Sequence, residues 1–221
     1  MMHRKRGWIG LIIGYAGAML GVLAVRQLNQ LLIRTPSPAG RMAGIIAVYW
    51  LIALIPVAVM IVSRDRLKDY GFCSERPGMQ IMTGVLIAIG MSAVLTVMPF
   101  LLGFGEFVRS GTGYRHLWQC AFEFVYCIFS VGFTEELVFR GFLLERLRRV
   151  LQNDIAAFVI SSVLFGLFHI FSGSIVQVIL TAMIGLLLCI CKRKIRHCTL
   201  LSLILAHGIY DALISVWSFV F

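Results

Sequence analysis

Two adjacent glutamates, Glu135 and Glu136, lie just before an arginine, Arg140, in a stretch that is otherwise apolar. Ionised side chains are costly to place in a membrane, so they persist mainly where they pair or take part in chemistry. On a helix, Glu136 and Arg140 share a face in the favourable order for an ion pair, whereas Glu135 points about 100° away. We therefore expect Glu136 to pair with Arg140 and Glu135 to remain available as a general base.

Two further apolar stretches carry histidine. His169 follows Phe165 by four residues, and His207 precedes Asp211 by the same spacing. The His207–Asp211 spacing puts a carboxylate beside an imidazole on one helix face, where it can orient or charge the ring. Taken alone, His169 also fits a structural hydrogen-bonding role, and Asp211 also fits a role only as the partner of His207.

These titratable groups have similar depths along their helices. Counted at about 1.5 Å of rise per residue from charged residues at one end, Glu135 and His207 lie about 16 Å deep. His169 and Asp211 lie about 22 Å deep on the same count. Polar groups that lack water need one another as partners. We therefore predict one shared site made of Glu135, Glu136, Arg140, His169, His207 and Asp211.

Membrane-spanning helices must position this site. Of the 221 residues, 60% are hydrophobic and 14% are charged, and the charges cluster between long apolar runs. This pattern is typical of a polytopic helical membrane protein. We predict an all-α transmembrane bundle of about seven spans, with residues 1–116 as an N-terminal scaffold of about three helices and residues 117–221 as a catalytic core of about four. The apolar segments are Gly7–Val25, Met42–Val62, Met79–Leu102, Leu117–Phe139, Ile155–Phe171, Ser174–Cys191 and Thr199–Phe221.

The basic residues predict the orientation. The N-terminal tail and residues 63–78, 140–154 and 192–197 hold 15 of the 20 Lys and Arg residues. Because basic residues concentrate on the cytoplasmic side, we expect the N-terminus in the cytoplasm and the C-terminus outside. The net charge of +10 is explained in the same way, and we expect no nucleic-acid partner because no separate basic domain exists. The six cysteines show no paired metal-binding spacing and are expected to act as small apolar side chains.

Three motifs occur in order on successive segments: Glu135-Glu136-x-x-x-Arg140, Phe165-x-x-x-His169 and His207-x-x-x-Asp211. Together they resemble the CPBP family, the CAAX proteases and bacteriocin-processing enzymes, also called the Abi family of intramembrane proteases. The resemblance extends from about Leu117 to Ala212. The last motif departs from the most familiar form, which has Asn where this chain has Asp211.

The resemblance implies an intramembrane endopeptidase in a bacterial cell membrane that hydrolyses a peptide bond of a membrane-associated peptide or protein. In this scheme Glu135 activates a water that His169 helps to hold, and His207 and Asp211 stabilise the tetrahedral oxyanion. The histidines and carboxylates are enough ligands for a possible Zn site, but the chain has no H-E-x-x-H motif. Both a metal-dependent and a glutamate-type reaction therefore stay open.

Two other functions compete with proteolysis. The first is a non-proteolytic CPBP-like membrane protein that acts in bacteriocin self-immunity or envelope regulation. The second is an ion-coupled transporter that uses the buried carboxylates. No inverted repeat or pair of broken helices is evident in the sequence, which disfavours the transporter.

Overall fold

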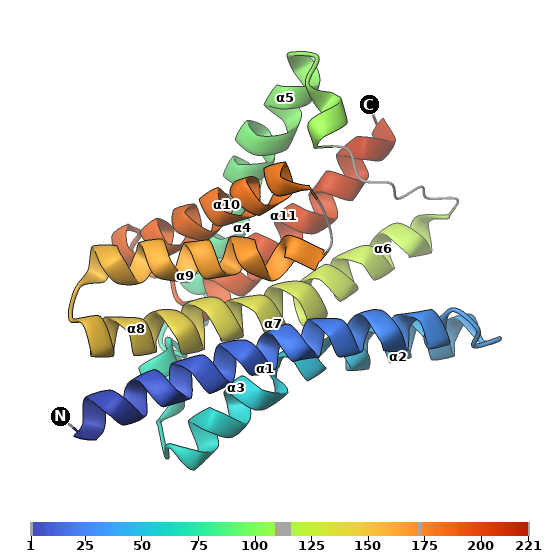
Figure 1. Ribbon diagram of the computed structural model, residues 1–221. Coiled ribbons are helices and arrows are strands. Elements are labelled where there is room, and N and C mark those ends of the chain that lie inside the picture. The colour runs from blue at the N-terminus through green and yellow to red at the C-terminus, as the bar shows by residue number, and fades with distance from the viewer. Residues whose placement is uncertain (1, 109–115, 172–173, 221) are drawn as a thin grey trace.

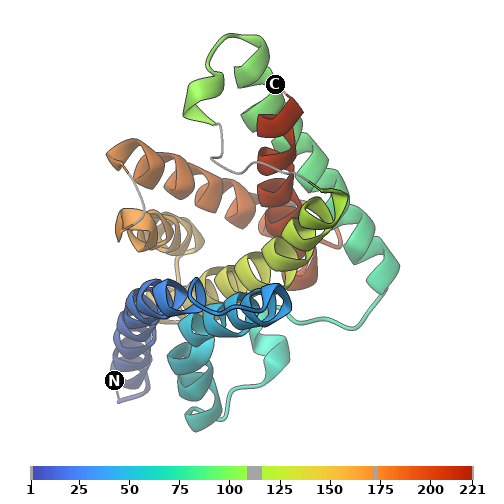
Figure 2. The ribbon, with the colours of Figure 1, turned by 90° about the vertical axis from the view of Figure 1, so that its right-hand side faces the viewer.

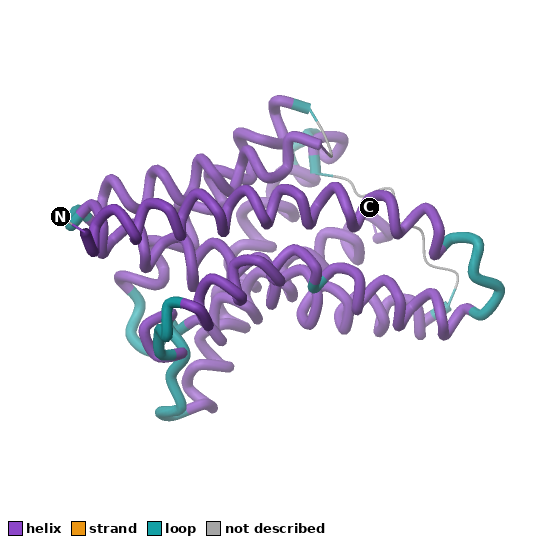
Figure 3. Tube along the Cα trace, turned by 60° about the horizontal axis from the view of Figure 1, so that its bottom comes forward, coloured by secondary structure: helices purple, strands orange, loops and turns teal. Residues whose placement is uncertain are grey.

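The computed structural model describes residues 2–108, 116–171 and 174–220. Within these ranges the chain forms helices and connecting loops and contains no strand (Figure 3). The N-terminus and the C-terminus lie at opposite ends of the helical bundle (Figure 1). The α-helices are α1 (Met2–Leu32), α2 (Pro38–Tyr49), α3 (Leu51–Val62), α4 (Pro77–Ser92), α5 (Met98–Leu101), α6 (Leu117–Tyr126), α7 (Phe133–Glu136), α8 (Leu144–Leu151), α9 (Asp154–Phe168), α10 (Ile175–Lys194) and α11 (Leu200–Val220).

Several short helical segments complete the chain. Their bounds are η1 (Leu67–Tyr70), η2 (Ala93–Val97), η3 (Gly105–Phe107), η4 (Cys127–Gly132), η5 (Leu137–Leu143) and η6 (His169–Phe171). The segments η1, η3 and η6 are 3₁₀ helices, and η2, η4 and η5 are π-helical. The predicted outer loop, Gly103–His116, includes residues 109–115, which lie outside the described residues.

In the described part of the chain, six helical segments are long and apolar enough to cross a membrane. They are Gly7–Leu32, Pro38–Val62, Pro77–Leu101, Asp154–Phe171, Ile175–Lys194 and Leu200–Val220. The protein is an integral membrane protein, and the predicted polytopic helical bundle is confirmed. The predicted segment Leu117–Phe139 is not among the six. It belongs to a helical run that continues through α8 and is buried at every residue from 134 to 144, so this part faces the protein interior.

Short polar side chains fix the starts of three helices. The Ser37 hydroxyl accepts a hydrogen bond from the Gly40 amide before α2, and the Asn153 side chain accepts one from the Ala156 amide before α9. Ser174 caps α10 in the same way. The first amides of a helix have no partner within the helix, so these caps satisfy groups that a membrane interior would leave unpaired.

The run from α6 to α8, hereafter the central helix, changes its helical form around the glutamates. The four-residue α7, which carries both glutamates, lies between the π-helical segments η4 and η5. Side chains of neighbouring helices reach the carbonyls of η5: Ser161 donates to Phe139 O at 3.1 Å, and Lys192 donates to Arg140 O at 2.7 Å. Segments with π-helical bonding occur frequently at functional sites, which is consistent with the chemistry expected of α7.

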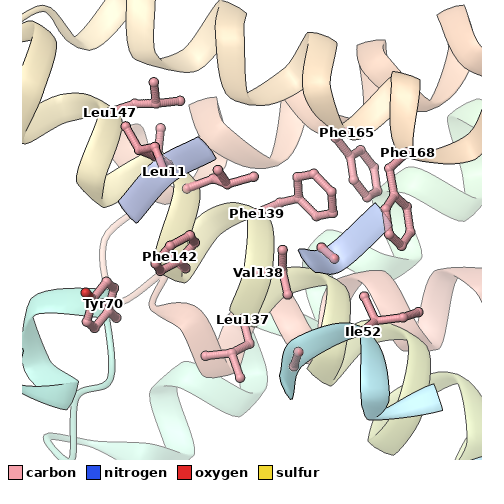
Figure 4. Packing of buried hydrophobic residues seen from close by; sticks show 14 of the residues in the cluster. Leu11, Ile52, Tyr70, Leu137, Val138, Phe139, Phe142, Leu147, Phe165 and Phe168 are labelled. Atoms are coloured by element: carbon pink, nitrogen blue, oxygen red, sulfur yellow. The ribbon is translucent and has the colours of Figure 1, made fainter. Parts of the chain in front are cut away.

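A hydrophobic cluster surrounds the central helix (Figure 4). The Phe139 ring packs edge-on against Phe165 and Phe168 of α9, with ring centroids 4.9 and 5.1 Å apart. Leu11 of α1 and Ile52 of α3 belong to the same cluster. Figure 2 shows α1 and α3 on one side of the central helix, with α9, α10 and α11 on the other. This cluster includes residues from both sides of the predicted division at residue 116. The division itself stays a prediction.

Glycines allow α11 to lie directly against the central helix. A Cβ added at Gly208 would lie 2.5 Å from Ile128 Cα, and one added at Gly132 would lie 2.6 Å from Ile204 O. No larger side chain fits at such distances, so the two backbones are in contact. Gly166 permits the same approach of α9 to α10, since its added Cβ would lie 2.5 Å from Val178 O. These contacts bring the histidines of α9 and α11 towards the glutamates.

Arg140 and Arg146 belong to residues 140–154, which the charge count assigns to the cytoplasmic side, and both have acidic partners inside the protein. Both are buried within the central helix, with exposed fractions of 1% and 7%. Arg140 pairs with Glu136, and Arg146 pairs with Asp65 at 2.6 Å. A count of basic residues along the chain cannot detect that acidic partners hold these guanidinium groups inside the protein.

Candidate active site

The six predicted residues lie on the central helix, at the end of α9 and on α11. Glu135 and Glu136 lie on α7, and Arg140 follows on η5. His169 begins the 3₁₀ turn η6 at the end of α9, and α11 carries His207 and Asp211. Contacts between these side chains join all six residues into one group, as described below.

Glu136 is the central acceptor of the group. Its Oε1 accepts a hydrogen bond from Arg140 Nη1 at 2.9 Å and lies 2.8 Å from His207 Nδ1. Glu136 and Arg140 are almost completely buried, with exposed fractions of 0% and 1%. The predicted ion pair is confirmed. Its contact with His207 was not predicted, and it brings the motif of α11 against the motif of the central helix.

Arg140 also contacts an aromatic ring. Its guanidinium carbon lies 4.2 Å from the centroid of the Phe165 ring, a cation–π contact. The same ring meets His169 and His207 edge-on, with centroid distances of 5.0 and 5.8 Å. Phe165 therefore packs against the arginine and against both imidazole rings.

The two carboxylate oxygens of Glu135 have different surroundings. Oε1 accepts a hydrogen bond from the Tyr49 hydroxyl of α2. Oε2 is buried and has no hydrogen-bond partner among the described residues, a condition it shares with Oε2 of Glu136. Only the Glu135 oxygen faces two imidazoles: it lies 3.8 Å from His169 Nε2 and 3.9 Å from His207 Nε2. Glu135 thus has one anchored oxygen and one directed between two ring nitrogens.

The second nitrogen of each imidazole is held by another group. His169 Nδ1 lies 3.0 Å from the Phe165 carbonyl oxygen, and His207 Nδ1 faces Glu136. On the other side of the His207 ring, Nε2 lies 3.3 Å from Asp211 Oδ2, so the predicted His207–Asp211 contact is confirmed. A partner on one ring nitrogen fixes the orientation of the ring and directs the opposite nitrogen. Nε2 of His169 is accordingly directed towards Glu135, whereas Nε2 of His207 lies between Asp211 and Glu135.

Tyr49 is the member of this group that the sequence analysis missed. It lies 86 residues before Glu135 in a span that was assigned to the scaffold. A tyrosine hydroxyl in an apolar segment usually finds a polar partner, which is the one signal that the sequence offered. That signal does not identify the partner, because the pairing depends on how α2 and the central helix cross.

A polar network outside the spans holds the other end of the central helix. Arg146 donates to Ser63 at 2.7 Å, to Asp65 at 2.6 Å and to the Tyr70 hydroxyl at 3.2 Å. Burial and the hydrogen bond to Asp65 raise the pKa of Tyr70 above its usual value. Tyr70 therefore remains neutral and able to donate, and this network fixes α8 against the loop that precedes α4.

The side chains of the site do not form an evident metal centre. Among the residues that the structure describes, no group of three or more His, Cys, Asp or Glu side chains is placed to hold a metal ion. His207 has carboxylate oxygens within 3.3 Å on both sides of its ring, which leaves neither nitrogen clear for a metal. The possible Zn site therefore stays a prediction.

Comparison with known families gives one match. Residues 117–213 match the family model described as type II CAAX prenyl endopeptidase, Rce1-like. No curated protein and no solved structure is significantly similar to the chain. The matched range includes the central helix, α9, α10 and most of α11, and so contains all six predicted site residues. The predicted resemblance to the CPBP family is confirmed for this range.

Proposed function

We propose that this chain, whose residues 117–213 are of the CAAX prenyl endopeptidase type, is an intramembrane endopeptidase in which Glu135 activates the attacking water. The observation that carries the proposal is the position of Glu135 Oε2, which is buried and lies 3.8–3.9 Å from two imidazole Nε2 atoms. These distances exceed a direct hydrogen bond and suit a water held between the carboxylate and the rings.

The reaction begins with proton transfer. Glu135 Oε2 takes a proton from the water, and the water oxygen forms a bond to the carbonyl carbon of the substrate peptide. Tyr49 holds the other carboxylate oxygen, so Glu135 cannot rotate away from the water. His169, oriented by the Phe165 carbonyl, directs its Nε2 to the same place and helps to hold the water.

The tetrahedral intermediate carries a negative oxygen that needs hydrogen-bond donors. His207 lies between Glu136 and Asp211, and as an imidazolium it donates from both ring nitrogens. We assign stabilisation of this negative oxygen to the positive charge of the His207 imidazolium, which Glu136 and Asp211 hold in place. Asp211 is then a positioning and charge-balancing partner of the ring, which is a role that a carboxylate serves better than that of a neutral oxyanion donor.

The intermediate collapses when the carbon–nitrogen bond breaks. Glu135, now a carboxylic acid, returns its proton to the leaving amine nitrogen, and the new acid terminus carries the oxygen of the water. Glu136 and Arg140 keep their charges throughout and hold His207 in place. The substrate is a peptide or protein associated with the membrane, since the site lies in a membrane-embedded bundle.

The proposal is tested by cleavage of a fluorogenic membrane-associated peptide by the purified protein in liposomes. Glu135→Gln keeps the shape of the side chain and removes the base, so we expect kcat to fall by about 10²–10⁴-fold. Glu123→Gln is the matched control, because Glu123 lies on the same central helix and contacts Ser215 of α11, away from the site. Full activity of Glu135→Gln, with Glu123→Gln also active, would exclude Glu135 as the base.

Two further measurements separate the competing schemes. We expect a membrane-permeant chelator to leave the cleavage rate unchanged; loss of activity that added Zn²⁺ restores would contradict the metal-free reaction. A self-immunity role without proteolysis predicts that Glu135→Gln cells keep an immunity phenotype. Loss of both cleavage and phenotype in that variant would support proteolysis as the cellular function.

A further inference from the structure

A cavity of about 320 Å³ lies outside the candidate active site, where several helices end. It lies among the loop around η1, the helices α8 and α9, the end of α10 and the residues just before α11. Four basic side chains line it: Lys68, Arg148, Lys192 and Arg193. Neither the proposed reaction nor the family match assigns it a role.

The carboxylates near this cavity do not balance its positive charges. Glu145 pairs with Lys192 at 2.8 Å and with Arg148 at 3.2 Å. Asp154 pairs with Arg148 at 2.8 Å and with Arg193 at 3.3 Å. Two carboxylates thus form ion pairs with three of the four cations. Among the described residues, no ion pair involves Lys68. The cavity therefore has a surplus of positive charge and attracts an anion.

The cavity lies at the level where lipid headgroups meet the protein. Lys192 and Arg193 are in the last turn of a membrane-spanning helix, and Thr199 directly precedes the first turn of another. α8 and α10 end on the side of the bundle where the N-terminus lies (Figure 1). Basic pockets between spans at this level suit anionic lipid headgroups. The N-terminus of α11 adds a positive dipole end at the cavity wall.

An apolar groove continues from this basic cavity. The groove has a volume of about 630 Å³ and shares Lys68, Phe72 and Cys73 with the cavity. Its other walls are mainly apolar and include Ile81 of α4 and Phe129 of η4. A free inorganic anion would make no favourable contacts with the apolar walls of this groove. A molecule with a negative headgroup and a long apolar chain fills both spaces at once.

We propose that the cavity and the groove together bind one anionic phospholipid, with its headgroup phosphate at Lys68 and Arg193 and one acyl chain along Ile81. This site is separate from the six residues of the candidate active site. One contact joins the two regions, because Lys192 also donates to the carbonyl oxygen of Arg140. Lipid binding therefore does not depend on the proposed proteolysis, and it is measured without a peptide substrate.

Native mass spectrometry of the detergent-solubilised protein tests the proposal. Phosphatidylglycerol and phosphatidylcholine with the same acyl chains are titrated separately, and inorganic phosphate forms a third arm. We expect one phosphatidylglycerol to bind at concentrations where phosphatidylcholine does not. The double variant Lys68→Gln/Arg193→Gln should bind it about 30-fold more weakly, since each cation near an anionic lipid contributes about 1 kcal/mol.

Two controls distinguish the pocket from the general charge of this face. Lys194→Gln/Arg196→Gln removes the same charge from exposed residues that do not line the cavity, and should bind phosphatidylglycerol like the parent protein. Ile81→Trp fills the groove and should weaken lipid binding with both cations present. Equal binding of the two lipids, full competition by inorganic phosphate, or equal losses in the two charge variants would overturn the proposal.

Discussion

The Glu136–Arg140 ion pair is enclosed on all sides, so the loss of one partner leaves the other charge without compensation in a dry environment. Glu136→Gln retains the side-chain shape and isolates the charge change. Breaking a buried pair from one side costs about 3–5 kcal/mol. Glu136 is 0% exposed and Arg140 is 1% exposed, so no solvent screening reduces this value. We expect Glu136→Gln to lower the free energy of unfolding by that amount.

Replacing Arg140 removes a cation–π contact as well as the ion pair. Arg140→Met removes the guanidinium from above the Phe165 ring, where its central carbon is 4.2 Å from the centroid. A desolvated cation–π contact contributes about 1–2 kcal/mol beyond the ion pair. In the double variant Glu136→Gln/Arg140→Met no isolated charge remains. The loss of unfolding free energy in the double variant should therefore be about 2–3 kcal/mol smaller than the sum of the losses in the two single variants.

Unfolding by SDS in mixed micelles, followed by tryptophan fluorescence, measures these differences. Asp154→Asn is the control, because the Asp154 side chain is 39% exposed and its ion pairs face solvent. Such a surface pair contributes less than about 1 kcal/mol. The reasoning fails if Glu136→Gln costs no more than Asp154→Asn, or if the losses of the two single variants simply add in the double variant.

Three further outcomes are expected. Tyr49→Phe should lower kcat by about 10–150-fold with little change in KM, because a hydrogen bond to a charged group contributes about 1.5–3 kcal/mol and here positions the base. An unchanged kcat in the liposome cleavage assay would remove Tyr49 from the site. Burial raises the pKa of Cys198 to about 12, so its thiolate is scarce at pH 8, and maleimide should label the exposed Cys73 and leave Cys198 unmodified in single-cysteine proteins analysed by mass spectrometry. Accessibility tags at the N-terminus and the C-terminus should report opposite sides of the membrane, with the N-terminal tag cytoplasmic; both tags on one side would contradict seven crossings.

The ion pair, the shared site and most spans followed from the sequence because they depend on local rules. Apolar length predicts a membrane helix, and a spacing of four residues puts Glu136 beside Arg140 and His207 beside Asp211. Similar depths along different helices predicted that His169 would meet Glu135. These inferences need only the rise and the repeat of an α-helix, which do not depend on the rest of the fold.

Other features depended on how helices are rotated and crossed. His207 and Glu136 are 71 residues apart in the sequence. Their spacing does not predict that Nδ1 of His207 faces Glu136 and that Nε2 lies near Glu135. The π-helical segments on both sides of α7 change the rotation of the central helix, so a regular period of 3.6 residues does not predict its faces. The buried position of Arg146 depended on a distant partner, Asp65, in the same way.

By itself, the sequence determined that the chain is a helical membrane protein, that its polar residues gather at one depth, and which motif residues form the group, because hydropathy and helical spacing are local properties. Only the tertiary structure decided that Tyr49 anchors Glu135 and that one carboxylate oxygen is directed between two imidazoles. It also decided where basic residues near the helix ends enclose a cavity. These features depend on close contacts between distant helices, which glycines such as Gly208 permit but do not specify.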